Sequence, residues 1–537
     1  MTSRITEVAR RALGHERLLP GQKEAVESLV EGRDTLVVMP TGSGKSAIYQ
    51  IAAEIIDGPT VVVSPLIALQ QDQIDSIQRT DAGEAAAANS ALSDTERDET
   101  LEAAADDEIE FLFMAPEQFA NDDVVQKLVE AQPSLFVVDE AHCISAWGYD
   151  FRPDYMRIGA MLEHLGHPTT LALTATASPP VREEILERLA MRDPAVVVRG
   201  FDRPNICMEV KRFGSDAHKQ RELVERVANE SPPGIVYVAT RKNAEEVADA
   251  LRERSLRAQH YHAGMAATAR TQVQERFMAD DIDVIVATTA FGMGIDKPNV
   301  RYVFHLQIPQ SIDNYYQEFG RAGRDGEPAK AALFYRSEDL NLRRFFAASG
   351  RIEPDQLAGV LDEIDGSGKT DVKDLKERLA LSDTKLQTAL NLLETSGAIS
   401  MSADGTVTQE RDLDLEETIE EVARRQETHR TVEQSRVDMM RSYAETKDCR
   451  RQFVLNYFGE DYPGPCGNCD NCHEGTTVAD AAQPFALNST VVHRQWGRGL
   501  VVRYEGDKMT ILFDEVGYKS LSGQLVVDND LLTSAEE

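Results

Sequence analysis

The sequence predicts an α/β protein with two similar lobes, and two observations carry this prediction. Short apolar runs rich in β-branched residues, such as 35–39 and 234–238, have the length of buried parallel strands. Segments with apolar residues at helical spacing follow such runs, for example 243–254. Alternating strands and helices predict parallel sheets that are covered by helices. Because 537 residues are too many for one core, we expect several domains.

A glycine-rich segment directly follows the first apolar run. It reads Pro-Thr-Gly-Ser-Gly-Lys-Ser over 40–46, and a helical pattern begins after it. Strand, loop and helix in this order predict a phosphate-binding loop, in which Lys45 reaches the β- and γ-phosphates and Ser46 ligates Mg²⁺. Met39 stands where the general pattern has its first glycine, and a glycine turn without nucleotide is the alternative. The expected nucleotide-binding residues of this loop are Thr41, Gly42, Ser43, Gly44, Lys45 and Ser46.

An acidic pair ends another apolar run. The run 135–138 continues into Asp139 and Glu140, so the two carboxylates are expected at the carboxyl edge of a buried strand. There Asp139 would hold Mg²⁺ and Glu140 would orient the attacking water. Two solvated acids at the end of a strand are the alternative interpretation.

Two arginines lie three residues apart in the segment 317–326. We expect Arg321 and Arg324 to share a helix face and to point into a cleft, where they would neutralise charge on a transferring γ-phosphate. A solvated basic face is the alternative. With Lys45, Asp139 and Glu140, these arginines complete the expected catalytic set.

An aromatic segment directly follows the acidic pair. Trp147 and Phe151 are interleaved with Gly148 and Pro153, which favours a loop over an ordinary core pair. Exposed aromatic rings stack on nucleic-acid bases without demanding a sequence, and the adjacent Arg152 can add a phosphate contact.

These motifs occur in an order that resembles the RecQ family of superfamily 2 helicases. The resemblance covers residues 13–335 and is specific, because the aromatic segment separates this family from other Asp-Glu-Ala-His helicases. Beyond the phosphate loop and the acidic box, it rests on the segments 20–22, 63–66, 174–177, 261–265, 290–296 and 317–326.

The resemblance implies two tandem RecA-like lobes and an ATP-dependent DNA helicase that moves 3′ to 5′ on single-stranded DNA, in repair and recombination. It implies that Gln22 reads the adenine. The residues expected to couple DNA to ATP are His142, Trp147, Phe151, Arg152, Thr174 and Thr176. Three positions depart from the family pattern, His15 and Leu19 near the adenine and Tyr149 in the aromatic segment.

Four of the six cysteines lie in one short region: Cys449, Cys466, Cys469 and Cys472. Four thiolates at this spacing predict a closed tetrahedral Zn²⁺ site with a structural role. Disulfides and an iron–sulfur cluster are the alternatives. The sequence has neither a secretory signal nor an apolar span of transmembrane length, so we expect a cytoplasmic protein in which disulfides do not form. Cys143 and Cys207 are expected to be small buried residues.

The motif map divides the chain into six expected units. The first lobe covers 1–199 and the second covers 200–350. An inserted segment over 351–428 reads as helix, helix and hairpin, which is compatible with a winged helix or with a helical spacer. The zinc subdomain covers 429–476, a linker 477–489, and a small SH3- or Tudor-like β-barrel 490–537.

The net charge of the chain has the same sign as that of DNA, its expected partner. Asp and Glu number 91 against 57 Lys and Arg, which gives a net charge of −34 and repels DNA over long distances. Binding of single-stranded, duplex or branched DNA must therefore depend on local arginines, backbone donors and stacking. Adaptation to a salty cytoplasm is a hypothesis for the acidity. A single-strand-binding or repair protein is a candidate partner, and no membrane partner is expected.

Two other functions compete with the helicase. One is an RNA-remodelling ATPase, because Asp-Glu-Ala-His boxes occur there too; the other is a DNA-annealing scaffold with vestigial lobes. The aromatic segment and the cysteine set weigh against the first, and the intact catalytic set weighs against the second.

Overall fold

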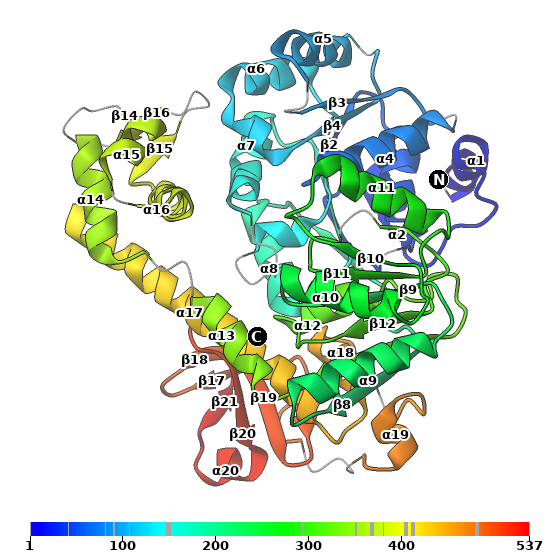
Figure 1. Cartoon of the computed structure of the whole chain (residues 1–537). Coiled ribbons are helices and arrows are strands. Elements are labelled where there is room, and N and C mark those ends of the chain that lie inside the picture. The colour runs from blue at the N-terminus through cyan, green and yellow to red at the C-terminus, as the bar shows by residue number, and fades with distance from the viewer. Residues whose placement is uncertain are drawn as a thin grey trace.

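A computed structural model of the chain shows two parallel α/β lobes, a small helical module, a cysteine-bearing subdomain and a C-terminal β domain (Figure 1). The residues that the structure describes are 2–40, 42–80, 82–89, 92–106, 108–145, 152–292, 295–348, 352–365, 370–379, 381–401, 406–409, 414–462, 464–477 and 483–535. Within them, no helix is both long enough and apolar enough to cross a membrane.

The first lobe is built on a parallel sheet that has seven strands among the described residues. In sheet order they are β3 (Ala85–Ala88), β4 (Phe111–Met114), β2 (Thr60–Val63), β5 (Leu135–Val138), β6 (Thr169–Thr174), β1 (Thr35–Val38) and β7 (Ala195–Val198). The inner strands are buried on both faces, which explains their continuous apolar sequences. The helices are α1 (Thr2–Leu13), α2 (Gln22–Val30), α3 (Lys45–Ala53), α4 (Ile67–Gln78), α5 (Asp94–Ala105), α6 (Asp122–Ala131), α7 (Ile158–His164) and α8 (Pro179–Arg188), with short 3₁₀ helices η1 (Pro116–Ala120), η2 (Ala141–Ile144) and η3 (Pro153–Arg157).

The second lobe repeats this architecture with a six-stranded parallel sheet in the described part of the chain. In sheet order its strands are β10 (Ala258–Tyr261), β11 (Val284–Ala287), β9 (Gly234–Tyr237), β12 (Tyr302–His305), β13 (Ala329–Tyr335) and β8 (Ile206–Arg212). Its helices are α9 (Asp216–Ala228), α10 (Arg241–Arg252), α11 (Ala267–Met278), α12 (Ile312–Phe319) and α13 (Asp339–Ala348). The prediction of two parallel lobes is confirmed.

The inserted segment forms a module with its own apolar core, which includes Leu361, Leu375 and Leu390. Its elements are α14 (Pro354–Asp365), β14 (Thr370–Asp371), α15 (Val372–Arg378), α16 (Asp383–Thr395), β15 (Ile399–Met401) and β16 (Thr406–Gln409). The three strands form an antiparallel sheet in the order β14-β16-β15. The Ser382 hydroxyl accepts a hydrogen bond from the N–H of Lys385, so Ser382 caps α16.

A long helix, α17 (Leu415–Glu445), connects this module to the rest of the molecule (Figure 1). It leads into α18 (Arg450–Tyr457) and α19 (Asp470–Glu474), which carry the cysteine region. The C-terminal domain contains β17 (Thr490–His493), β18 (Gly497–Glu505), β19 (Lys508–Phe513), β20 (Gly517–Ser522), α20 (Gly523–Asp528) and β21 (Leu532–Ser534). Its strands form an antiparallel sheet in the order β20-β19-β18-β17-β21, in which β18 and β19 form a hairpin.

Candidate active site and zinc centre

The phosphate loop lies between β1 and the first turn of α3. Gly42 and Gly44 have φ angles of 79° and 69°, a left-handed conformation that glycine adopts without strain. A Cβ atom at Gly44 would stand 2.6 Å from Nε2 of Gln22, so this position also needs glycine for space. Thr41, predicted as part of this loop, lies outside the described residues.

Lys45 begins α3 and folds its side chain back into the loop. Its Nζ donates hydrogen bonds to the carbonyl oxygens of Met39 at 3.1 Å and Pro40 at 3.4 Å. Burial lowers the pKa of Lys45, although the nearby carboxylates of Glu140 and Asp139 act to raise it. The ammonium group of Lys45 therefore lies among backbone carbonyls and carboxylates. A bound phosphate can replace its hydrogen bonds to the carbonyl oxygens.

Gln22 is buried at the start of α2 and holds the loop from the other side. Its Nε2 donates to the carbonyl oxygens of Ser43 at 3.2 Å and Gly44 at 2.9 Å. Its Oε1 accepts from the N–H of Leu19 at 2.7 Å. Gln22 thus connects the phosphate loop to the segment in which we expect the adenine.

Asp139 and Glu140 follow β5 at the carboxyl end of the sheet, as predicted. Burial and the adjacent Glu140 raise the pKa of Asp139 to about 7. Burial alone would raise the pKa of Glu140, but His142, Lys45 and Arg321 outweigh burial and lower it. Glu140 has a φ of 49°, which is uncommon outside glycine and directs the chain into η2. The two residues therefore differ: the pKa of Asp139 is raised, and the pKa of Glu140 is lowered, so Glu140 is the ionised member of the pair.

A buried polar chain leads from Glu140 to β6. Nδ1 of His142 lies 3.3 Å from Oε2 of Glu140 and 3.0 Å from Oγ1 of Thr174. The Thr174 hydroxyl donates to the carbonyl oxygen of Thr176 at 3.1 Å and accepts from its N–H at 3.2 Å. Burial alone would lower the pKa of His142, but Cys143 and Glu140 raise it. No local pattern in the sequence indicates the contact between His142 and Thr174, because these two residues lie 32 positions apart.

The two arginines of the second lobe do not share a helix face, so that part of the prediction is wrong. Gly320 caps the C-terminus of α12, and Arg321 and Arg324 lie in the turns that follow. Both side chains are buried, and neither Nε has a hydrogen-bond partner among the described residues. Nη1 of Arg324 donates to the carbonyl oxygen of Ile295 at 2.9 Å and to Asp296 Oδ1 at 2.5 Å.

Both arginines nevertheless lie beside the site in the first lobe. Arg321 helps to lower the pKa of Glu140, and Arg324 acts on the pKa of Lys45. A Cβ atom at Gly42 would stand 3.7 Å from the Arg324 side chain. Asp296, the last residue of the segment 290–296, anchors Arg324, and no local pattern in the sequence indicates this pairing.

Only the end of the aromatic segment lies within the described residues. Trp147 and Phe151 lie outside the described residues. Arg152 donates from Nη1 to the carbonyl oxygen of Pro65 at 2.9 Å, and its N–H donates to the carbonyl oxygen of Cys143. The Tyr155 hydroxyl donates to the carbonyl oxygen of Asp139 at 3.0 Å. Hydrogen bonds therefore connect the end of this segment to the acidic pair.

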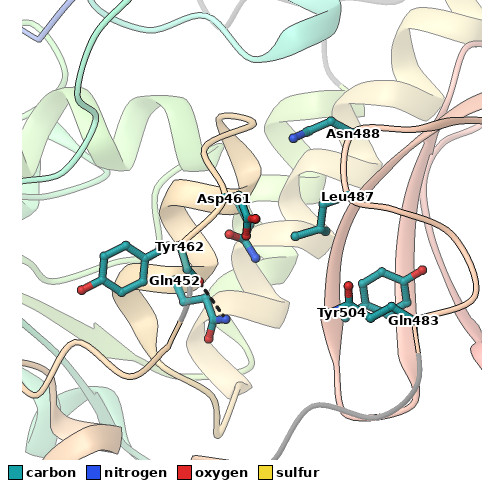
Figure 2. A pocket seen from close by; sticks show the side chains of 8 residues that line it. Gln452, Asp461, Tyr462, Gln483, Leu487, Asn488 and Tyr504 are labelled. Carbon is teal, nitrogen blue, oxygen red and sulfur yellow. Dashed lines mark hydrogen bonds between the residues drawn. The ribbon is translucent and has the colours of Figure 1, made fainter.

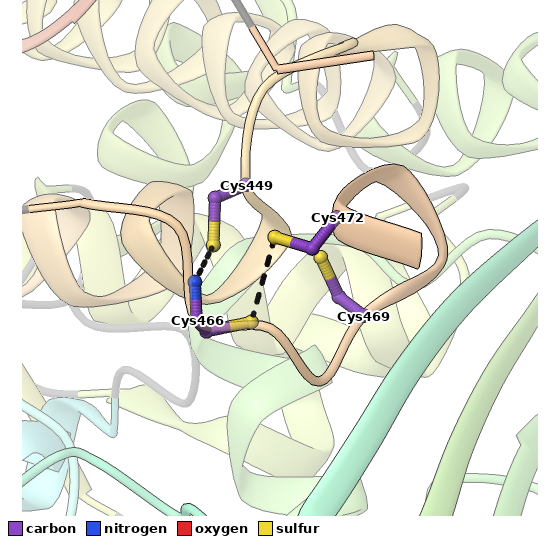
Figure 3. Close-up of side chains that lie close together, drawn as sticks. All are labelled: Cys449, Cys466, Cys469 and Cys472. Atoms are coloured by element: carbon purple, nitrogen blue, oxygen red, sulfur yellow. Dashed lines mark hydrogen bonds between the residues drawn. The ribbon is translucent and has the colours of Figure 1, made fainter. Parts of the chain in front are cut away.

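The four predicted cysteines converge on one point, although Cys449 is seventeen residues before Cys466 (Figure 3). Their sulfur atoms all lie within 4.8 Å of one another, and those of Cys466 and Cys472 are 3.9 Å apart. Sulfurs around a tetrahedral zinc ion are separated by roughly 3.8 Å, because each Zn–S bond is about 2.3 Å. Backbone N–H groups of Cys466 and Asn468 donate to the sulfurs of Cys449 and Cys466. The cluster fits Zn²⁺ with no open coordination position.

The remaining cysteines lie apart from this cluster. Cys143 is fully buried, as predicted, whereas Cys207 is only half-buried, so the prediction for Cys207 is wrong. Position 207 belongs to β8, beside the subdomain that carries the cysteine cluster.

A small polar cavity of about 190 Å³ lies between α18 and the C-terminal domain (Figure 2). It is lined by Gln452, Asn456, Asp461, Tyr462, Gln483, Leu487, Asn488 and Tyr504. None of these residues belongs to the nucleotide site, so the cavity is a feature of the domain boundary.

Three family models match the chain. They are the DEAD/DEAH box helicase over residues 19–185, the helicase conserved C-terminal domain over 218–326 and RecQ zinc-binding over 409–473. Together with the cysteine cluster, these families confirm the predictions of ATP with Mg²⁺ and of Zn²⁺.

Two solved helicase structures resemble the fold. The helicase Lhr of Mycobacterium smegmatis, solved with ssDNA and AMP-PNP, matches with a TM-score of 0.50 and 21% identity over 80% of this chain and 62% of that chain. The DUF1998 helicase MrfA, solved with DNA, matches with a TM-score of 0.53 and 16% identity over 77% of this chain and 63% of that chain. At these identities the likeness concerns the fold alone.

Two relatives from Bacillus subtilis are similar over most of the chain. The probable ATP-dependent DNA helicase RecS is 36% identical over 84% of this chain and 88% of its own length. The ATP-dependent DNA helicase RecQ is 32% identical over 97% of this chain and 76% of its own length. With the matched helicase and zinc-binding families, this similarity shows that the chain belongs to the RecQ family of ATP-dependent DNA helicases.

Proposed function

We propose that this RecQ helicase hydrolyses ATP in a site shared by its two lobes and uses the resulting lobe movement to advance on single-stranded DNA. One observation carries this proposal: Arg321 of the second lobe lies close enough to the buried Glu140 of the first lobe to influence its ionisation. A site that needs both lobes couples nucleotide occupancy to the distance between them.

Each catalytic residue has a role in this proposal. Lys45 holds the β- and γ-phosphates, Asp139 and Ser46 hold Mg²⁺, and Glu140 orients the attacking water. Arg321 and Arg324 neutralise the charge that develops on the γ-phosphate. Their unpartnered Nε groups support this role, since buried guanidinium donors usually have an acceptor.

The chain of contacts from His142 to Thr176 is the proposed link between hydrolysis and movement. A change in charge at Glu140 alters the hydrogen bonding of His142, which shares its Nδ1 with Thr174. Trp147, Phe151 and Arg152 would report DNA binding to the same region, because this segment begins directly after His142 in η2.

The finer features of the molecule are proposals as well. We propose that the protein translocates from 3′ to 5′ and unwinds duplex or branched DNA in repair and recombination. We also propose that it is cytoplasmic and that a single-strand-binding or repair protein is its partner. The names of the relatives support the DNA substrate. We also propose that the module within 351–428 is a winged-helix-like unit and that 490–537 is an SH3- or Tudor-like barrel; helix–helix–hairpin order and the antiparallel sheet support these assignments.

The experiment that tests the proposal is ATP hydrolysis with and without single-stranded DNA across a series of salt concentrations. We expect strong stimulation by DNA, weak stimulation by RNA and loss of DNA stimulation in Trp147→Ala, with basal hydrolysis retained. The exposed variant Lys242→Ala is the matched control and should behave like the unmodified protein.

Two outcomes would overturn the proposal. Equal or stronger stimulation by RNA would favour an RNA-remodelling ATPase. Absence of hydrolysis together with intact strand annealing would favour a scaffold.

A further inference from the structure

The second lobe contains a cluster of metal-ligand side chains that the helicase cycle does not use. Glu245 lies on α10, His260 on β10, and His262 directly follows β10. Each offers one donor atom, and the three donor atoms lie within 4.8 Å of one another. We propose that these residues bind a divalent transition-metal ion of the zinc class, separate from the ion held by the four cysteines.

The local fold places the two histidines together. His260 and His262 are two residues apart along an extended chain, so their side chains point to the same face. Their rings are nearly parallel, with an interplanar angle of 9° and centroids 5.3 Å apart. β10 is the edge strand of the second sheet, and α10 packs beside it; Nη1 of Arg252 donates to the carbonyl oxygen of Ala258 at 3.0 Å.

The existing contacts already resemble a ligand set. Nε2 of His262 lies 3.2 Å from Oε1 of Glu245, and ligands around a tetrahedral ion with bonds of about 2.1 Å are separated by roughly 3.4 Å. The Glu245 side chain is half-exposed and the His262 side chain is buried. The carboxylate can therefore adjust to an ion while His262 stays fixed.

Two nitrogen atoms in the cluster lack partners. Nδ1 of His260 and Nδ1 of His262 are buried and have no hydrogen-bond partner among the described residues. A buried ring nitrogen without a partner costs free energy unless a ligand or water satisfies it. His262 is itself 5% exposed, so solvent reaches little of its ring. An ion in the cluster would contact His262 through Nε2, the nitrogen that faces Glu245, and the free Nδ1 of His260 is available as a second nitrogen ligand.

The donor set defines the class of ion. Two imidazoles and one carboxylate suit Zn²⁺ and similar transition metals, whereas Mg²⁺ and Ca²⁺ prefer oxygen ligands alone. Three protein ligands leave a fourth position for water or an anion. Nη1 of Arg241 lies 2.9 Å from where a Cβ atom at Gly264 would stand, and His262 Nδ1 lies 3.2 Å from the same point. Arg241 therefore lies near Nδ1 of His262, whereas Glu245 lies near Nε2 of the same ring.

The test measures zinc in the full chain with its cysteine site intact. The protein is equilibrated with low micromolar free Zn²⁺, passed through a sizing column and analysed by mass spectrometry of the metal. We expect two zinc ions per chain in the unmodified protein and one in His260→Ala. The control His164→Ala removes an exposed histidine that bonds only within its own helix, and it should retain two.

A second variant, Glu245→Gln, separates loss of zinc from loss of folding. A second ion, Co²⁺, distinguishes the proposed site from the cysteine site. Glu245→Gln preserves the side-chain volume at a surface position and should also retain one zinc ion. Co²⁺ added to protein that carries one zinc ion per chain, held by the four cysteines, should give absorption bands without sulfur-to-metal charge transfer, and both variants should lose them. One zinc ion in the unmodified protein, or two in both variants, would overturn the proposal.

Discussion

At the scale of single residues, the nucleotide site combines groups that are costly to bury. Lys45, Asp139 and Glu140 are all enclosed. The pKa of Asp139 is raised and that of Glu140 is lowered, because Glu140 has a direct hydrogen bond with His142. Such perturbed groups cluster at functional sites, where substrate binding offsets the cost. Substitution of a residue of this site should therefore lower activity and raise the stability of the fold.

Lys45→Ala tests the proposed role of the loop lysine. Loss of a preorganised cation beside the phosphates should reduce DNA-stimulated ATP hydrolysis by at least about 100-fold. Steady-state hydrolysis at saturating DNA measures this, and the fold should be retained because Nζ bonds only to backbone carbonyls. Activity close to that of the unmodified protein would contradict the assignment.

Asp139→Asn tests the raised pKa of Asp139, which is about 7 in the folded chain. Its usual value is about 3.9, so between pH 4 and 7 the folded state holds a proton that the unfolded state has released. The stability from this proton is complete below about pH 4 and is lost as pH rises through 7. The amide does not ionise, so the substitution should stabilise the nucleotide-free protein by about 2–3 kcal/mol more at pH 8 than at pH 5.

Thermal unfolding of both proteins at the two pH values measures this difference. The exposed variant Asp123→Asn should show no such pH-dependent gain. An equal effect of Asp139→Asn at pH 5 and pH 8 would contradict the raised pKa.

At the scale of elements, the short helices around the cysteines are held by buried apolar residues, such as Phe453 and Tyr457 of α18, and by polar contacts to the second lobe. Asp470 accepts from the N–H of Val210 at 2.8 Å and from Nε of Arg450 at 2.5 Å. Arg451 donates to the carbonyl oxygen of Ile206 at 2.8 Å. Zinc binding and docking onto the second lobe should therefore be lost together.

Cys469→Ser tests this dependence. Binding of structural zinc contributes about 10–16 kcal/mol in small zinc domains, so loss of one ligand should leave the subdomain unfolded. We expect one fewer zinc ion per chain, a lower Tm and rapid proteolysis between α17 and α19. Cys207→Ser is the control, since Cys207 lies outside the cluster, and it should keep its zinc. A Cys469→Ser protein with normal zinc content would exclude Cys469 as a ligand.

At the scale of the whole molecule, α17 and the zinc subdomain form the surface on which the C-terminal domain docks. The buried Arg503 of β18 lies over the ring of Phe453 in α18, 3.9 Å from its centroid. Thr446 donates to Glu505 at 2.6 Å. On the other side, β20 packs against α17 so closely that a Cβ atom at Gly517 would stand 2.2 Å from Ser435 Oγ. The C-terminal domain is therefore a docked unit of the molecule.

Gly517→Ala tests this docking. The added methyl group would collide with α17, and we expect a loss of about 1–3 kcal/mol and faster proteolysis of the segment 477–489. Gly497→Ala is the matched control in the same domain: its φ of 72° carries a similar backbone strain, but nothing lies within 4 Å of the added atom. Equal effects of the two substitutions would contradict close packing at position 517.

The net charge of −34 also belongs to the whole molecule. If the acidity reflects salt adaptation, folding and ATP hydrolysis should persist at molar KCl, where mutual repulsion of the carboxylates is screened. Circular dichroism and hydrolysis across a KCl series measure this. Loss of either at molar KCl would contradict the hypothesis.

The parallel lobes, the glycine-rich loop before α3, the acidic pair after β5 and the four clustered cysteines could all be predicted from the sequence alone. These features depend on local patterns: apolar runs of strand length, glycines before a helix, and cysteines at fixed spacing. The capped helix at Ser382 and the hairpin of β18 and β19 are local in the same sense.

Only the tertiary structure decided how distant segments meet. The contact of His142 with Thr174, the turn that holds Arg321 beside Glu140, and the cluster of Glu245 with two histidines join residues from different elements. The helical spacing of the two arginines was also misleading, because α12 ends before them, at Gly320. The sequence specifies which side chains are present. The distances between them and their burial, which determine pKa values and metal coordination, exist only in the folded chain.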